Sequence, residues 1–198
     1  MTDLFPKDSK KIRERIRRYE RALRKEQDEH GFYSDGYGKR YLLGPLYLLM
    51  DDLEGALKSF AWFEENFPDD SGDPMHYQCW TLALYRSGDL EAATRKLRQT
   101  VLLNLYLIPR LLEIEQDELD IWHGTSTAWK EHLESIPPEI FGLWADDSRE
   151  WARETYNSPA IQQVRERYIE IHRQLQDESE YEKRVKLVEE ASRLKRLD

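Results

Sequence analysis

The chain has a single cysteine, Cys79, and no long uninterrupted apolar run. One cysteine excludes an internal disulfide and is typical of proteins in a reducing compartment. The most apolar stretches, YLLGPLYLLM and VLLNLYLIPRLL, are too short to span a bilayer, which takes roughly 20 apolar residues. The first residues, MTDLFPKDSKK, lack the apolar core of a secretory signal. We therefore expect a cytoplasmic protein with no membrane partner.

The chain has fewer basic residues than acidic residues. The 198 residues include 30 Lys or Arg and 39 Asp or Glu, for a formal net charge of -9. A generic nucleic-acid binder is excluded, because such proteins are basic as a whole. Disorder is also excluded, because aromatic residues reach 12% and disordered chains contain few. A chain of this length fits one domain, or one domain with an appendage, around a substantial core.

Apolar and polar residues do not alternate as they would in a β-strand. The apolar residues recur instead at the spacing of a helix. Ile12, Ile16, Tyr19 and Leu23 recur at steps of four, three and four, which places them on one face of a helix. The same spacing runs through most of the chain, so we predict an all-α fold. The expected helices are 9–30, 39–50, 53–66, 75–87, 89–103, 105–115 and two near the end, one from Pro159 and one over 179–196.

One turn and helix start occur twice. The stretch LLMDDLEGALKSF is followed 37 residues later by YRSGDLEAATRKL. Repeated helix pairs at a fixed period indicate a solenoid, because one pair cannot bury its apolar face alone. The repeated pattern therefore predicts two stacked helical hairpins, one over residues 37–70 and one over residues 74–107.

The residues of the first copy resemble the tetratricopeptide repeat. Leu43-Gly44-x-x-Tyr47 is followed by Ala56, Phe60 and Pro68, and small Gly44 and Ala56 would let the paired helices approach closely. The second copy keeps Tyr77, Trp80, Ala93 and Leu97. It departs from the pattern at three positions, where Thr81 replaces the small Gly, Leu84 the Tyr and Leu105 the closing Pro. In the first copy, Phe63 occupies a position that is usually small. The segment Asn104-x-x-x-Ile108-Pro109-x-x-Leu112 is similar to uncharacterised bacterial proteins of this type. The resemblance implies a superhelix of stacked hairpins and adds no activity.

Four regions follow from these patterns. The boundaries are a basic N-terminal capping helix (1–36), the repeats with the start of a degenerate third (37–115), a Trp-rich irregular helical insertion (116–157) and a C-terminal helical hairpin (158–198). In the insertion, Trp122 and Trp129 are seven residues apart, as are Trp144 and Trp151. Indoles at this spacing favour a folded cover over the core.

The resemblance also implies a binding surface. The first helix of each pair lines the concave face of such a stack, and a non-catalytic protein or peptide partner could bind there. The residues expected on this face are Tyr41, Leu48, Leu49, Gln78, Leu82, Tyr85 and Arg86. The alternative is that the third helix and the C-terminal hairpin cover them. Self-association through the terminal helices is a further alternative.

A basic run is the second candidate. Residues 7–26 hold ten Lys or Arg against four acids, a local charge of +6, so the remainder of the -9 chain sums to -15. Arg13, Arg17, Arg21 and Arg24 could contact nucleic acid in a regulatory module. The simpler interpretation is that this helix docks its apolar face and turns its arginines toward the acidic remainder of the chain. We rank nucleic acid behind a protein partner for that reason.

Catalytic motifs are absent. No phosphate-binding loop, dinucleotide fingerprint or nucleophile elbow is present. His76-x-x-Cys79 offers two metal ligands but no second pair, and DDSGD (69–73) lacks the closing Glu of a calcium loop. We expect no enzyme, no cofactor and no metal. The enzyme alternative is an uncharacterised hydrolase centred on His123.

Overall fold

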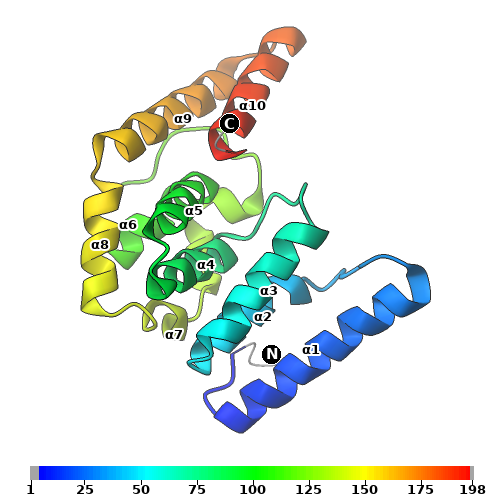
Figure 1. Cartoon of the computed structure of the whole chain (residues 1–198). Helices are drawn as coiled ribbons and strands as arrows, with labels where there is room; N and C mark the ends of the chain where they lie inside the picture. The colour runs from blue at the N-terminus through cyan, green and yellow to red at the C-terminus, as the bar shows by residue number, and fades with distance from the viewer. Residues whose placement is uncertain (1–4, 197–198) are drawn as a thin grey trace.

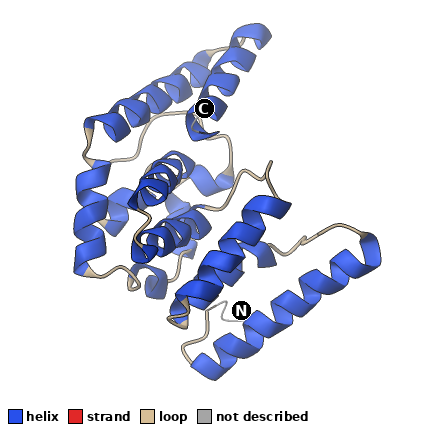
Figure 2. Ribbon diagram, in the orientation of Figure 1, coloured by secondary structure: helices blue, strands red, loops and turns tan. Residues whose placement is uncertain are grey.

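Helices and connecting loops make up the whole of the described structure. The computed structural model describes residues 5–196, and within that range it contains no strand (Figures 1 and 2). The all-α prediction is confirmed. Across the same range, no helix combines the length and the apolar character that a membrane crossing requires.

The helices follow one another with short connections in the first half of the chain. They are α1 (Ser9–His30), α2 (Lys39–Leu49), α3 (Leu53–Asn66), α4 (Pro74–Ser87), α5 (Leu90–Leu103) and α6 (Leu107–Leu111). Two 3-10 turns come next, η1 (Ser126–Ala128) and η2 (Lys130–Ser135). The remaining helices are α7 (Pro138–Phe141), α8 (Asp146–Tyr156), α9 (Pro159–Asp177) and α10 (Tyr181–Arg196).

The two copies of the repeated turn, before α3 and before α5, have the same backbone geometry. Asp52 and Asp89 are the N-caps of α3 and α5, and their carboxylates accept the amides of Gly55 at 2.8 Å and Ala92 at 3.0 Å. An N-cap acceptor of this kind stabilises a helix by about 1 kcal/mol. The residue before each cap is left-handed, with φ 57° at Asp51 and 84° at Gly88. The hairpins α2–α3 and α4–α5 therefore share their turn geometry.

The predicted close approach of α2 and α3 occurs at Gly44. A Cβ atom added there would lie 2.3 Å from Cε1 of Phe60. Phe60 is fully buried, as are Ala56 in α3 and Ala93 in α5. Phe60 also stacks on Trp80 of α4, with ring centroids 5.4 Å apart and an interplanar angle of 5°, so the first hairpin packs on the second.

The expected helix over 105–115 is wrong in its extent. Helix α6 ends at Leu111, and Glu113 adopts a left-handed φ of 56°. Both ends of α6 have tertiary partners: Arg149 and Arg153 of α8 donate to the carbonyls of Leu111 and Leu112 at its end. Asn104 accepts the amide of Tyr106 at 2.9 Å and donates to the carbonyl of Thr127 at 2.8 Å, which ties the start of the helix to the insertion.

The insertion is an ordered cover, held partly by one arginine. Arg149 of α8 donates to the carbonyls of Trp144 at 3.0 Å, Phe141 at 2.8 Å and Leu111. Trp144 is buried, and Trp151 packs on Tyr85 of α4 with ring centroids 4.9 Å apart. Trp144 and Trp151 thus pack against the rest of the chain, whereas Trp129 is 47% exposed.

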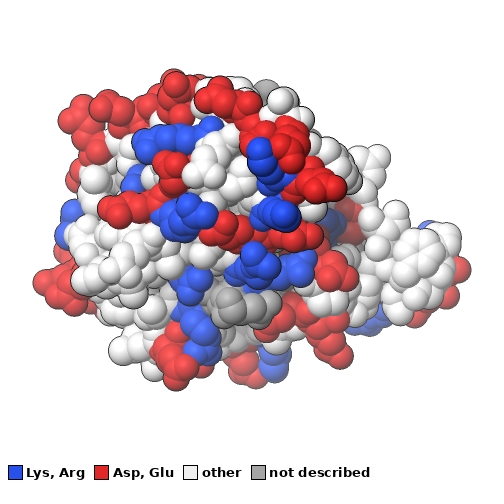
Figure 3. Space-filling view, turned by 90° about the horizontal axis from the view of Figure 1, so that it is seen from above, with Lys and Arg blue, Asp and Glu red and all other residues white. Residues whose placement is uncertain are grey.

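The two ends of the chain pack on opposite parts of the hairpins (Figure 1). Helix α1 buries Ile12, Ile16 and Leu23, the stripe that the sequence predicts, and lies along α2. Helices α9 and α10 form a hairpin whose last turn contacts α5. There Arg98 and Gln99 donate to the carbonyls of α10 residues, each at 3.1 Å. Figure 3, seen from above, shows acidic and basic side chains interleaved over this end of the molecule.

Replacing Gly44 with alanine should destabilise the protein by about 1–2 kcal/mol. The helix propensity of alanine favours the change by roughly 0.5–1 kcal/mol, but overpacking against Phe60 costs typically 1–3 kcal/mol. Denaturant unfolding measures the difference. The control is Gly36→Ala, where the added Cβ has nothing within 4 Å. Equal stability of the Gly44→Ala variant and the wild type would contradict the tight α2–α3 contact.

Candidate functional site

The face of α2 and α4 that was expected to bind a partner is covered. Leu48, Gln78 and Leu82 are 2%, 0% and 0% exposed. Leu48 belongs to the same apolar cluster as Leu133 and Ile140 of the insertion, and α2 contacts α7. Leu82 belongs to the second apolar cluster, with Ile108 of α6 and Ile171 of α9. The third helix, the insertion and the C-terminal hairpin therefore all contribute to the clusters that enclose Leu48 and Leu82, and the three residues belong to the core.

The four remaining residues of that expected groove also make internal contacts. The Tyr41 hydroxyl donates to Asp70 at 2.5 Å, and Leu49 packs against the first apolar cluster. Tyr85 donates to Asp147 at 3.1 Å, and Arg86 donates to the carbonyl of Leu143 at 2.6 Å. Tyr85 and Arg86 thus fasten the insertion down, and the seven expected residues do not form an open groove.

The arginines of α1 have a different environment. Arg13, Arg17, Arg21 and Arg24 are exposed, and none of them forms a salt bridge with any residue in 5–196. The apolar stripe of this helix docks as expected. Glu14 and Glu20 lie among Arg17, Arg21 and Arg24 without forming a salt bridge to them, so basic residues outnumber acidic ones on this face.

The candidate catalytic and metal residues are not assembled into a site. No group of three or more His, Cys, Asp or Glu side chains in the described structure could hold a metal ion. The His123 ring packs on Trp129 at 4.9 Å between centroids, and burial lowers its pKa. In the part of the chain that the structure describes, no serine or cysteine is hydrogen-bonded to this ring.

His76 and Cys79 are both internal. His76 is 0% exposed and its Nδ1 lies 3.1 Å from the carbonyl of Tyr41, so this nitrogen carries the proton and bonds α4 to α2. Burial lowers the pKa of His76 to about 3 and raises that of the Cys79 thiol. A neutral imidazole and a protonated thiol inside the core serve packing and not metal binding.

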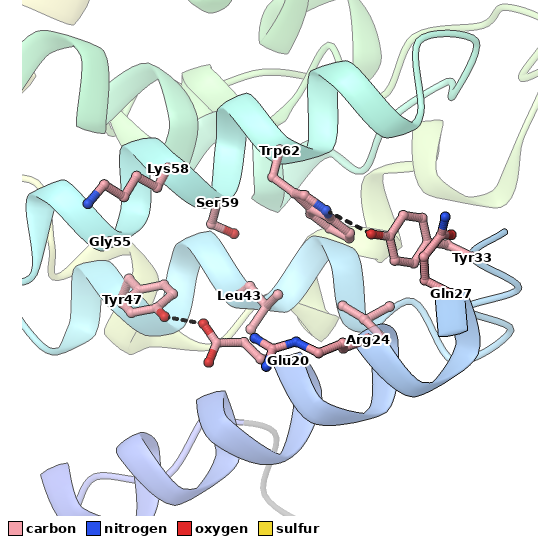
Figure 4. Close-up of a pocket in the computed structure, with 11 residues that line it drawn as sticks. Glu20, Arg24, Gln27, Tyr33, Leu43, Tyr47, Gly55, Lys58, Ser59 and Trp62 are labelled. Atoms are coloured by element: carbon pink, nitrogen blue, oxygen red, sulfur yellow. Dashed lines mark hydrogen bonds between the residues drawn. The ribbon is translucent and has the colours of Figure 1, made fainter. Parts of the chain in front are cut away.

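An open pocket lies elsewhere, between α1, α2 and α3. Its volume is about 370 Å³. Figure 4 shows aromatic residues at both ends, with Tyr47 of α2 at one end and Trp62 of α3 beside Tyr33 at the other. The remaining lining residues are Glu20, Leu23, Arg24, Gln27, Leu43, Gly55, Lys58 and Ser59. Sequence reasoning missed this pocket, because its walls come from three helices whose relative placement only the fold determines.

Hydrogen bonds hold the aromatic walls in place. The Tyr47 hydroxyl donates to Glu20 of α1, and Trp62 Nε1 lies 3.4 Å from the Tyr33 hydroxyl (Figure 4). Burial and the neighbouring Glu20 carboxylate raise the pKa of Tyr47, so its hydroxyl stays protonated and keeps this bond. The walls are therefore set before any partner arrives, which reduces the entropy cost of binding.

The pocket is positively charged at its mouth. Arg24 lies on the α1 side without a salt bridge, and Lys58 lies on the α3 side with its amine 2.5 Å from Glu54. Inside, the only acidic lining residue is Glu20, which is engaged by Tyr47. An apolar interior with basic residues at its edge suits an acidic ligand that carries an apolar group.

Comparison with known proteins identifies no relative. No protein-family model, curated protein or solved structure matches this chain. The function is therefore inferred from the geometry of the chain itself.

The buried His76 predicts a loss of stability in acid. Its folded pKa of about 3 lies below the unfolded value of 6.5, so the unfolded chain binds more protons between these values and stability falls as the pH drops through this window. By pH 4.5 the loss from this group should reach a few kcal/mol. Urea unfolding of the wild type and a His76→Gln variant, which keeps a hydrogen-bond donor, measures the contribution. Parallel pH profiles for the two proteins would contradict the prediction.

Proposed function

We propose that the chain is a non-catalytic protein-binding module, a short tetratricopeptide-like stack whose binding site is the pocket between α1, α2 and α3. The partner is an acidic peptide or helix that inserts one apolar side chain. The observation that carries this proposal is the pre-formed aromatic pocket whose lining includes Arg24, an exposed arginine that forms no salt bridge within residues 5–196. The α2–α4 face, where binding was first expected, is occupied by the insertion.

The size of the pocket supports an anchored side chain. A volume of about 370 Å³ accommodates one large apolar residue, and most binding energy in protein interfaces comes from a few such anchors in well-packed pockets. Trp62 and Tyr47 are each partly buried by their own neighbours, so a ring or leucine side chain between them would gain contact area without rearrangement.

The charge of α1 supports an acidic partner. Arg17, Arg21 and Arg24 follow one another at steps of four and three, so they form a row on α1 roughly 10 Å long at 1.5 Å per residue. Arg24, at the end of this row, lines the pocket, and Glu14 and Glu20 lie among the three arginines. A segment with Asp or Glu at similar spacing could pair with this row while its anchor occupies the pocket. Unpaired charges of this kind also raise association rates.

The test is a peptide array of acidic segments that each carry one Leu, Phe or Trp, with matched segments in which the acids are Lys. We expect binding of the acidic set alone. An Arg24→Glu/Lys58→Glu variant should bind roughly tenfold more weakly, since each exposed ion pair contributes up to about 1 kcal/mol. The control is Lys186→Glu, an exposed residue of α10 far from the pocket. Equal binding by both charge variants would contradict the proposed site.

Nucleic acid is the second candidate, and the exposure of Arg13, Arg17, Arg21 and Arg24 on α1 favours it. A Gln variant of Arg13, Arg17, Arg21 and Arg24 should lose any salt-dependent binding to DNA or RNA, because phosphate contacts release counterions. Fluorescence anisotropy with a labelled oligonucleotide at two salt concentrations measures this. A Ser59→Leu variant, which fills the pocket, separates the two candidates, since it should weaken peptide binding and leave nucleic-acid binding unchanged. No affinity of the wild type for the oligonucleotide at low salt would exclude this candidate.

A further inference from the structure

A second pocket lies on the other side of α3, between α3, α4, α5 and the end of α10. Its volume is about 410 Å³. Aromatic side chains of α3 and α4, among them Phe63, Tyr77 and Trp80, form its walls, and Lys96 of α5 projects into it. Neither the sequence patterns nor the proposed peptide site uses this pocket.

Lys96 is unusual among the lysines of the chain, because it is only 9% exposed. Its Nζ lies 3.4 Å from the centre of the Trp80 ring and 4.9 Å from that of Tyr77. The single carboxylate near it is that of Glu64, at 3.6 Å, on a side chain that is itself 68% exposed. The amine is therefore held against an aromatic floor and only weakly paired with an acid.

Desolvation favours the neutral form of the Lys96 amine, whereas the Trp80 ring and the Glu64 carboxylate favour its charged form. Burial is the main cause that lowers the pKa of Lys96 to about 8, Arg95 lowers it further, and Glu64 opposes both. The other titratable or charged groups that line the pocket are Asp69 and Asp70 from the α3–α4 loop, Tyr77 of α4, and Lys195 and Arg196 of α10. Near neutral pH, a larger fraction of Lys96 than of an exposed lysine therefore carries a free lone pair, as a nucleophile requires.

We propose that Lys96 is a nucleophilic amine that binds uncharged aromatic aldehydes covalently, as an imine, in this pocket. The site is independent of the proposed peptide-binding function. The Nζ lone pair attacks the carbonyl carbon, and a carbinolamine forms. Loss of one water molecule then gives the imine. No oxidant or reductant is consumed, and the reverse reaction with water releases the aldehyde.

The lining determines the class of aldehyde. Three acids (Glu64, Asp69 and Asp70) and three bases (Lys96, Lys195 and Arg196) line the pocket, so it has no preference for a charged ligand. The aromatic walls favour a planar ring of about the size of benzene. Once formed, a protonated imine keeps its positive charge over Trp80, where the cation–π contact that Lys96 already makes can continue.

The experiment treats the intact protein at pH 7.5 with benzaldehyde and cyanoborohydride, which reduces any imine to a stable benzylamine. Peptide mapping by mass spectrometry gives the rate of modification at each lysine. We expect Lys96 to be modified about tenfold faster than Lys58, because the neutral fraction of an amine rises as its pKa falls. Lys58 is the control because it is an exposed lysine whose pKa is raised by Glu54. Modification of Lys96 at the same rate as Lys58, or more slowly, would overturn the proposal.

Two further measurements make the result specific to the pocket. The rate at Lys96 should rise severalfold between pH 6.5 and pH 8.5 and then level off, whereas the rate at Lys58 should continue to rise. A Lys96→Arg variant keeps a cation over Trp80, so it should fold as the wild type does and lose only the fast modification. Fast modification that persists in this variant, at Lys195 or elsewhere, would assign the reactivity to another amine and overturn the proposal.

Discussion

The contact between Gly44 and Phe60 is the constraint on which the rest of the structure depends. Because no side chain intervenes, α2 and α3 pack closely enough for the Phe60 ring to lie between them. The ring then stacks on Trp80, which joins the first hairpin to the second. Trp80 in turn forms the floor beneath Lys96. One close helix approach therefore positions the core of both hairpins and one of the two pockets, and the other pocket opens on the opposite side of α3.

The face of α2 and α4 that was expected to bind a partner is buried in this structure. A stack of two helix pairs leaves the inner face of α2 and α4 apolar, and an apolar face of that size must be covered or must bind a partner. In this chain residues from α6 to α7 cover it, and Leu133, Ile136 and Ile140 complete the cluster around Leu48. Polar groups at the edge, including Arg86 and Tyr85, bond to the insertion and not to a ligand. The pocket that we propose for recognition lies elsewhere, between α1, α2 and α3.

The polar and charged residues of this protein differ in how far they are buried and in whether they border a pocket. His76 is enclosed, neutral and hydrogen-bonded to the Tyr41 carbonyl, so it has no access to a ligand. Lys96 is also desolvated, but it borders a pocket and is only weakly paired. Arg13, Arg17, Arg21 and Arg24 of α1 are the opposite case, because they are exposed and form no salt bridge with a residue of the described range 5–196. Each environment supports a different role, namely packing, nucleophilic chemistry and electrostatic recognition.

Local sequence patterns determined most of the secondary structure of this protein. Apolar spacing places the stripe of α1 correctly, and the repeated Asp-Leu-Glu marks both N-caps, because caps and periodicity act over a few residues. Gly44 could be assigned to a close helix contact for the same reason. The end of α6, the cover over Leu48 and Leu82, and both pockets were decided only by the tertiary structure. Each depends on contacts between residues distant in sequence, such as Asn104 with Thr127 and Arg149 with Leu111, which no local pattern contains.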